Sequence, residues 1–362
     1  MLIFVIVIND EKNFSAECGH IKSVDSVIKR MKIVFFEVQN WEKKLLLSAF
    51  PKAILTHEKL TIDNASRYQE AKIISCFIYS ALNAEVLKLL PHLVYIGTRS
   101  TGYDHIDVDY CKKNHILVTN VPEYGTNTVA EHTFALILSL TRKIYQSINQ
   151  SKNLNFDQTT IRGIDLYGKT LGIVGLGKIG QQVLRIAKGF QMNVLVYNRT
   201  KDSKLAQKLD FQYVELEVLL ARSDIVSLHL ALNEHTKHIV NKKRIGQFKK
   251  GAYLVNTARG GLIETEAIID GLEQQILEGV GLDVLEEEKE LNEEIAILSS
   301  EYKRAVDLKT LVYNHILINH PKVLITPHNA FNSVEALHRI ANTSIKNMQN
   351  FIVKRLKDIT VV

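Results

Sequence analysis

The chain has 362 residues, a length for which we expect two domains, each with its own core. Hydrophobic residues at 46% and charged residues at 23% are typical of a globular protein. The net charge of +6 is spread along the chain, so nucleic acid is not an expected partner. The three cysteines are odd in number and widely spaced, which argues against a disulfide framework or a metal site and suits a cytoplasmic protein.

The first 30 residues differ from the rest. Residues 1–8 are apolar but too short to span a bilayer, and they lack the features of a signal peptide, so we expect no membrane association. Residues 9–30 are mostly polar, and a clean apolar strand begins at about Met31. We interpret residues 1–30 as an extension or as the product of a wrongly assigned upstream start codon. An added edge strand is the alternative.

From Met31 to about Asn120, short apolar runs alternate with helical stretches such as residues 84–90. This alternation predicts βα units on a parallel sheet. The predicted strands cover residues 33–36, 53–56, 73–77, 94–97 and 116–119. An apolar helix over residues 127–145 then leads into a second domain.

A glycine motif organises the second domain. The apolar run 171–174 leads directly into Gly175, Gly177 and Gly180, and a further apolar run covers 194–197. The helix predicted between the two runs has an apolar face formed by Val183, Ile186, Ala187 and Phe190. Glycines in this spacing between a strand and a helix predict a dinucleotide-binding turn. The first allows the tight turn, the second lets the backbone approach a pyrophosphate, and the third lets helix and strand pack closely.

Later strands of this domain are predicted at residues 225–228, 252–256, 280–284 and 323–326. Polar residues come at the ends of three of them: Thr257 and Arg259, Asp283 with Glu288 beyond it, and His328. The carboxyl ends of parallel strands meet at one edge of a sheet, so these residues should converge on one site. Taken singly, Arg259 could cap a glycine turn, Glu288 could belong to an acidic surface run over 286–294, and His328 could be structural.

Several motifs in order resemble the D-isomer-specific 2-hydroxyacid dehydrogenases, and within them the D-lactate dehydrogenase branch. Besides the glycine motif, they are residues 99–107, 120–124, 130–132, 256–260, 281–284 and 326–328. The resemblance implies an α/β fold with two doubly wound parallel-sheet domains and the cofactor in the cleft between them. One would be a flavodoxin-like substrate domain formed by 31–123 and 331–362, and the other a Rossmann nucleotide domain formed by 124–330.

The C-terminal helix would pack back on the first domain through an apolar stripe. This stripe is formed by Val334, Leu337, Ala341, Ile345, Met348 and Ile352.

The resemblance also implies a catalytic trio of Arg259, Glu288 and His328. The forked cation of Arg259 can grip the carboxylate and the carbonyl oxygen of a 2-keto acid. A histidine titrates near neutral pH, so His328 can give a proton to that oxygen during reduction and accept it during oxidation. Glu288 would orient the imidazole and favour its protonated form. The nicotinamide ring would supply the hydride.

Further roles are carried over by motif. Backbone N–H groups of Ser100, Thr101 and Gly102 should reach the substrate carboxylate, and Tyr124 should line the substrate pocket. The remaining cofactor contacts implied are Lys178 and Ile179 at the pyrophosphate, Leu230, Ala231 and Thr236 along the cofactor, and Thr257, Ala258 and Asp283 on the nicotinamide side. The chain departs from the family in two places. Ala231 stands where proline is usual, and residues 289–327 form a longer connection than in most relatives.

The choice of cofactor depends on the end of the strand at 194–197. An enzyme specific for NAD normally has Asp or Glu there to bond the ribose hydroxyls, but this chain has Asn198, followed by Arg199 and Lys201. Asn198 would not repel a 2′-phosphate, and the two cations could pair with it. We therefore expect NADP(H) to be accepted, with NAD(H) use also open. In the alternative, Asn198 bonds the ribose and the cations are only solvated.

The predicted function is reduction of a small 2-keto acid, with pyruvate as the leading candidate, to the D-2-hydroxy acid by NAD(P)H. Other 2-keto acids, namely 2-ketoisocaproate, glyoxylate and phosphohydroxypyruvate, are alternatives within the same class. A non-enzymatic dinucleotide sensor resembling a corepressor is the alternative from another class. The resemblance further suggests a homodimer built largely on the nucleotide domains.

Overall fold

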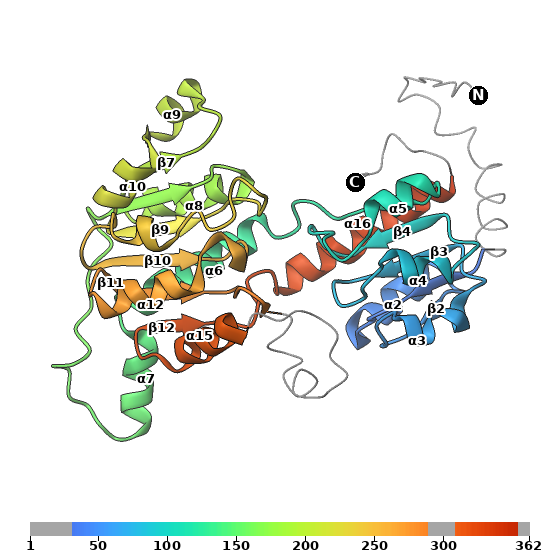
Figure 1. The fold of residues 1–362 in the computed structure, drawn as a ribbon, viewed down its shortest axis with the longest axis horizontal. Coiled ribbons are helices and arrows are strands. Elements are labelled where there is room, and N and C mark those ends of the chain that lie inside the picture. Colours follow the sequence, from blue (N-terminus) through green and yellow to red (C-terminus); the bar gives the residue numbers. More distant parts are fainter. Residues whose placement is uncertain (1–30, 289–307, 354–362) are drawn as a thin grey trace. The chain divides into compact units, whose positions relative to one another are not determined.

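The computed structural model describes residues 31–288 and 308–353, so the prediction for residues 1–30 lies outside the described part. The chain divides into two compact units (Figure 1). The first comprises the described residues of Met1–Tyr124 and Val334–Val362, and the second is Gly125–Ser333. Within the described ranges, no helix has both the length and the apolar character needed to cross a bilayer. The same ranges contain no cluster of His, Cys, Asp and Glu side chains suited to a metal ion.

The first unit is built on a five-stranded parallel sheet with the strand order β2-β1-β3-β4-β5. Its strands are β1 (Ile33–Phe35), β2 (Ile54–Leu55), β3 (Ile73–Cys76), β4 (Tyr95–Thr98) and β5 (Leu117–Thr119). Every residue of β1, β3 and β4 is buried, as expected for strands covered by helices on both faces. This strand order is the flavodoxin-like variant of the doubly wound fold, so the predicted class and the five predicted strands are confirmed.

The helices of this unit are α2 (Asn40–Ala49), α3 (Ile62–Ala65), α4 (Ala84–Lys88), α5 (Val108–Lys113) and α16 (Val334–Ile352), with a 3₁₀ turn η1 (Ser66–Tyr68). Ile345 and Met348 of α16 share a core cluster with Phe35 of β1. The predicted stripe on α16 was partly wrong, because Val334 is 69% exposed. Ala336, Ile340 and Ser344 are buried instead, so the packed face is rotated toward them.

The second unit contains a seven-stranded parallel sheet with the order β12-β11-β10-β9-β6-β7-β8. The strands are β6 (Thr170–Val174), β7 (Asn193–Tyr197), β8 (Gln212–Tyr213), β9 (Ile225–Leu228), β10 (Ala252–Asn256), β11 (Leu277–Leu282) and β12 (Val323–Ile325). The chain runs from β6 outward through β7 to β8, then returns to the other side of β6 at β9. The crevice at this reversal, outside the carboxyl ends of β6 and β9, is where doubly wound sheets bind ligands.

The sheet of the second unit is covered by helices on its two faces (Figure 1). They are α6 (Thr126–Thr141), α7 (Ile144–Lys152), α8 (Lys178–Gly189), α9 (Ser203–Leu209), α10 (Leu216–Arg222), α11 (Lys242–Ile245), α12 (Thr265–Glu273) and α15 (Leu308–Asn319), with a 3₁₀ turn η2 (Gly260–Leu262). On α8 the buried side chains are Val183, Leu184 and Ala187, whereas Phe190 follows the helix and is 39% exposed. The buried face of α8 is therefore rotated by part of a turn from the predicted one: Val183 and Ala187 belong to both, and Leu184 is buried where Phe190 was expected.

The single helix predicted over residues 127–145 is instead two helices. α6 ends at Thr141 and α7 begins at Ile144, with Lys143 between them in the left-handed region at φ 53°. The carbonyl of Thr141 accepts a hydrogen bond from the amide of Ile164, at 2.8 Å. Gly163 packs so closely that a Cβ there would lie 2.4 Å from the same carbonyl. A segment more than twenty residues later in the sequence thus ends the helix, and the apolar pattern alone could not indicate this.

Candidate active site

The three glycines of the turn after β6 differ in their surroundings. Gly175 has φ +100°, and a Cβ on it would lie 2.7 Å from the carbonyl oxygen of His229. A Cβ on Gly180 would lie 2.2 Å from the carbonyl of Gly175, so both positions require glycine for packing. Gly177 is exposed, and a Cβ there would have no neighbour within 4 Å. The turn is therefore closely packed at Gly175 and Gly180 and open at Gly177. Helix α8 begins directly after Gly177, with Lys178 and Ile179. This arrangement fits the pyrophosphate of a dinucleotide.

Asn198 ties the end of β7 to this turn. Its Oδ1 accepts a hydrogen bond from the amide of Leu176 at 3.1 Å, and its Nδ2 donates to the carbonyl of Thr200 at 2.6 Å. Arg199 is exposed. The ammonium group of Lys201 lies 2.8 Å from the Glu215 carboxylate, so this cation already has an ionic partner. Of the two predicted cations, Arg199 is the one better placed to pair with an added phosphate.

The loop after β9 contains Leu230, Ala231 and Thr236. The hydroxyl of Thr236 donates to the carbonyl of Ala231 at 2.7 Å and accepts from the amide of Asn233 at 2.8 Å. These bonds close the loop on itself, so a proline at Ala231 is not needed to fix it. At the start of the loop, burial lowers the pKa of His229 to about 4, which keeps its imidazole neutral.

Arg259 lies on a short loop whose backbone is hydrogen-bonded to the side chain of Asn256. Asn256 is fully buried at the end of β10; its amide nitrogen donates to the carbonyl of Arg259 and its amide oxygen accepts from the amide of Ala258. Thr257 is held by a hydroxyl contact of 2.8 Å with Thr133 of α6. The guanidinium of Arg259 donates one hydrogen bond to the carbonyl of Ala258, at 2.7 Å. Sequence reasoning assigned no role to Asn256, although it stands inside one of the quoted motifs.

The segment that follows β11 is held from three sides. A Cβ on Gly260 would lie 2.0 Å from the carbonyl oxygen of Leu285, so this close approach requires glycine. The carboxylate of Glu286 accepts from the hydroxyl of Thr265 at 2.9 Å and lies 2.5 Å from Nε2 of His238. Asn314 of α15 donates to the backbone carbonyl of Glu286 at 2.7 Å. Glu286 is thus a packed residue, while residues 289–294 of the predicted acidic run lie outside the described residues.

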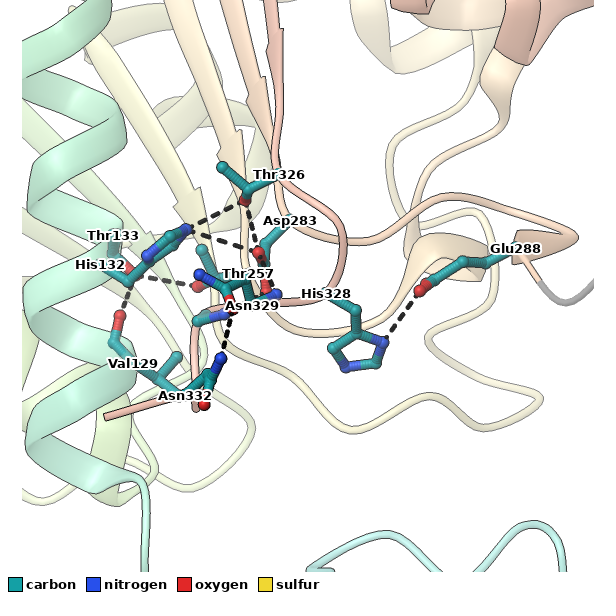
Figure 2. A network of polar contacts seen from close by, with 11 residues as sticks. Val129, His132, Thr133, Thr257, Asp283, Glu288, Thr326, His328, Asn329 and Asn332 are labelled. Carbon is teal, nitrogen blue, oxygen red and sulfur yellow. Dashed lines mark hydrogen bonds and ion pairs between the residues drawn. The ribbon is translucent and has the colours of Figure 1, made fainter. Parts of the chain in front are cut away.

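His328 and Glu288 come together at the end of these segments. Nδ1 of His328 lies 3.1 Å from Oε1 of Glu288, and both side chains are partly exposed (Figure 2). His328 has φ +50°, an uncommon conformation for a residue with a side chain. The contact engages Nδ1, so Nε2 is the nitrogen on the opposite edge of the ring. The structure therefore brings together two members of the predicted trio, with Arg259 at the end of the neighbouring strand β10.

Asp283 lies beneath the turn that carries His328. Its carboxylate accepts hydrogen bonds from the amides of Asn329 and Ala330 at 2.8 and 2.9 Å, and from the hydroxyl of Thr326. Burial by itself raises the pKa of Asp283, but these bonds and a contact with His132 outweigh it, so the net pKa is below the usual value. Asp283 is therefore ionised at neutral pH. Its expected place beside the nicotinamide stays a prediction.

The predicted substrate-binding residues belong to the first unit. The hydroxyl of Ser100 donates to the carbonyl of Gly102 at 2.6 Å, and that of Thr101 donates to Val121 at 2.9 Å. These bonds fold the loop after β4 tightly at the carboxyl edge of the sheet. The backbone carbonyl of Tyr124 accepts a hydrogen bond from Arg339 of α16, at 2.7 Å.

The comparison with known proteins agrees with this geometry. The family model described as "D-isomer specific 2-hydroxyacid dehydrogenase, NAD binding domain" matches residues 134–330. The D-lactate dehydrogenase of Escherichia coli is 32% identical, over 88% of this chain and 95% of its own length. The chain belongs to the D-isomer-specific 2-hydroxyacid dehydrogenase family. It is an NAD-binding oxidoreductase, and within the family it lies in the D-lactate dehydrogenase branch.

Two further relatives show how far this branch determines the substrate. The solved D-lactate dehydrogenase of Aquifex aeolicus, in complex with NAD and lactic acid, superposes with a TM-score of 0.81 at 34% identity, covering 91% of this chain and 99% of that one. The glyoxylate reductase of Pyrococcus furiosus is 32% identical, over 87% of this chain and 86% of its own length. Relatives at nearly the same distance thus have different substrates in their names.

Proposed function

We propose that this dehydrogenase reduces pyruvate, or a 2-keto acid of similar size, to the D-2-hydroxy acid. The contact between His328 and Glu288, at the carboxyl edge of the sheet that carries the open glycine turn, is the observation that supports it best. It pairs an imidazole with a carboxylate at the edge where a cofactor and a substrate would meet. The relatives named as D-lactate dehydrogenases favour pyruvate, and the glyoxylate reductase makes glyoxylate the main competitor.

Each residue of the trio has a distinct role in this proposal. Arg259 uses one guanidinium N–H on Ala258, and its remaining donors hold the substrate carboxylate. Nε2 of His328 gives its proton to the carbonyl oxygen as that oxygen gains charge, while Glu288 holds the ring by Nδ1. The reduced nicotinamide supplies the hydride when it is bound. For the first unit, the family resemblance implies that the backbone amides of Ser100, Thr101 and Gly102 contact the substrate and that Tyr124 does so too.

A substrate panel tests the proposal directly. Initial rates would be measured with pyruvate, 2-ketobutyrate, 2-ketoisocaproate, glyoxylate and phosphohydroxypyruvate, each with NADH and with NADPH. We expect the highest kcat/KM for pyruvate, and a D-configured product in a stereospecific assay. A higher kcat/KM for glyoxylate would replace pyruvate as the substrate, and no turnover of any of them would reject the proposal.

We also propose that NADPH is accepted. Asn198 is neutral and engaged with the glycine turn, so it places no carboxylate where a 2′-phosphate would lie. Arg199 would pair with that phosphate. Arg199→Ala should lower kcat/KM for NADPH by about ten- to a hundredfold and leave that for NADH nearly unchanged, since one charge-assisted hydrogen bond contributes about 1.5–3 kcal/mol.

Lys201→Ala is the matched control for Arg199→Ala. Because Lys201 already pairs with Glu215, its removal should change the NADPH-to-NADH ratio less. If the wild type strongly prefers NADH and Arg199→Ala leaves the ratio unchanged, Arg199 is only a solvated charge.

Finally, we propose a homodimer formed through α7 and the residues after it. This segment exposes large apolar side chains, among them Tyr145 at 58% and Phe156 at 75%. Several large apolar side chains exposed along one segment favour a protein partner. Light scattering after size-exclusion chromatography should give twice the chain mass, and Phe156→Glu should shift it toward the monomer. A monomeric wild type would exclude this arrangement.

A further inference from the structure

The backbone of the turn that carries His328 depends on one buried carboxylate. The amide of His328 donates to the backbone carbonyl of Asp283, and the next two amides, of Asn329 and Ala330, donate to its side chain. Asp283 is 1% exposed, so water contributes little to holding its carboxylate. Protein donors must therefore fix its orientation, and through it the left-handed conformation of His328.

His132 of α6 reaches this carboxylate from the opposite side. Its Nε2 contacts the hydroxyl oxygen of Thr326 and Oδ1 of Asp283 (Figure 2). The two distances are 3.0 and 3.4 Å. The Thr326 hydroxyl lies 2.5 Å from the same Oδ1. An ionised carboxylate can only accept hydrogen bonds, so the Thr326 hydroxyl must donate its single hydrogen bond to Asp283. His132 must then carry a proton on Nε2 and donate it, which sets the direction His132 to Thr326 to Asp283.

We propose that His132 is a positioning residue for the proton donor of the reaction. This inference rests on the proposed function, in which His328 exchanges the proton with substrate. Glu288 contacts the ring of His328, whereas His132 acts through Thr326 and the Asp283 carboxylate on the two backbone amides that follow His328. Without the donor on α6, the Asp283 carboxylate turns in its pocket and releases the amides of Asn329 and Ala330. Within the motif of residues 130–132, His132 thus serves as a hydrogen-bond donor, besides the packing of the helix to which the motif belongs.

Two substitutions of His132 distinguish the loss of its hydrogen bond from the loss of its packing. His132→Leu fills most of the space but donates nothing, whereas His132→Gln keeps an N–H donor at the end of the side chain. Thr141→Val is the matched control, because it removes a buried hydroxyl from the same helix. That hydroxyl donates to the carbonyl of Ile137 of α6, and among the described residues it has no contact with the turn.

Two readouts are measured on each full-length variant. The first is kcat/KM for pyruvate, and the second is amide hydrogen exchange of the peptide covering residues 326–333, which needs no turnover. We expect His132→Leu to lower kcat/KM by about tenfold or more, the effect of losing a hydrogen bond to a charged group, and to speed exchange of the turn. His132→Gln should stay within about threefold of the wild type in both readouts, and Thr141→Val should match the wild type in both.

Several results would overturn the inference. They are wild-type exchange of the turn in His132→Leu, a fall in kcat/KM without faster exchange, and a His132→Gln variant as impaired as His132→Leu. If His132→Leu does not fold, Thr326→Val replaces it, because it is isosteric and removes the next donor of the same chain. A wild type without turnover would reject the proposed function alone, and the exchange measurement would still decide the role of His132.

Discussion

At the scale of single residues, the proposed proton donor His328 and the glycine turn proposed for the cofactor belong to different segments. The imidazole of His328 follows β12, whereas the glycine turn follows β6. We therefore predict that His328→Ala lowers kcat by about 10²–10⁴-fold, the usual effect of losing a general acid, while NADH still binds. Steady-state rates and a fluorescence titration with NADH would check this. Near-normal kcat would remove His328 from the chemistry.

Arg259 allows a second test at this scale. Its loop is fixed by Asn256, so a substitution at the side chain changes the donor without moving the backbone. A lysine places a point charge there and cannot reproduce the planar fork. Arg259→Lys should lower kcat/KM for pyruvate on the order of a hundredfold, by analogy with other lost bidentate contacts to carboxylates.

The control for Arg259→Lys is Arg222→Lys, an exposed position at the end of α10. It should be indistinguishable from the wild type in kcat/KM. An Arg259→Lys variant with wild-type kcat/KM would contradict a forked grip on the substrate carboxylate.

These residues also show what a sequence can predict about a site. The glycines, Arg259 and His328 stand in short motifs whose spacing is visible in the sequence, and Glu288 follows the motif at 281–284. The structure brings Glu288 and His328 into contact. Asn314 is different, because its partner Glu286 belongs to another element and no local pattern links the two. Contacts between distant segments depend on tertiary packing, and propensity and periodicity do not contain that information.

At the scale of elements, the strands were predictable because buried parallel strands are continuous apolar runs. β8 was missed, since Gln212–Tyr213 gives only two residues and no such run. The end of α6 was missed for another reason. Ile164, from a distant segment, donates a hydrogen bond to the carbonyl of Thr141, and Gly163 packs against the same carbonyl. Elements fixed by their own sequence were predicted well, and boundaries fixed by their neighbours were not.

Helix α15 contacts the segment that carries Glu288. It is anchored to α12, where Glu266 binds Lys309 at 2.7 Å and Tyr313 at 2.9 Å. Its fully buried Asn314 donates to Glu286, two residues before Glu288. We predict that Asn314→Leu lowers kcat several-fold while the free energy of unfolding falls by only about 1 kcal/mol, the net value of one hydrogen bond.

Asn319→Leu is the matched control on the same helix. Asn319 also donates from its side chain to a backbone carbonyl, that of His315, but it is exposed and does not touch the segment after β11. Steady-state rates and urea unfolding of both variants would be compared. Equal kcat in the two variants would mean that α15 does not position Glu288.

At the scale of the whole molecule, each unit has its own hydrophobic cores. Ile74 and Ile96 are central to one cluster of the first unit, and Leu228 and Leu254 to one of the second. Units with separate cores and more than a hundred residues can unfold in separate transitions. The open glycine turn lies wholly within the second unit, so the cofactor should stabilise the two units unequally.

Calorimetry of the full chain with and without NADH tests this last point. At a concentration of about 100 Kd, NADH should stabilise the second unit by about 2.7 kcal/mol, which raises its Tm by about 5–10 °C. The transition of the first unit should move less. Gly177→Val is the decisive variant, because its side chain enters space that is open in the protein alone, so both transitions should keep their Tm without cofactor. The same side chain would fill the place proposed for the pyrophosphate, so the NADH-dependent shift should disappear. Equal shifts of both transitions, or a shift that survives in Gly177→Val, would contradict cofactor binding at this turn.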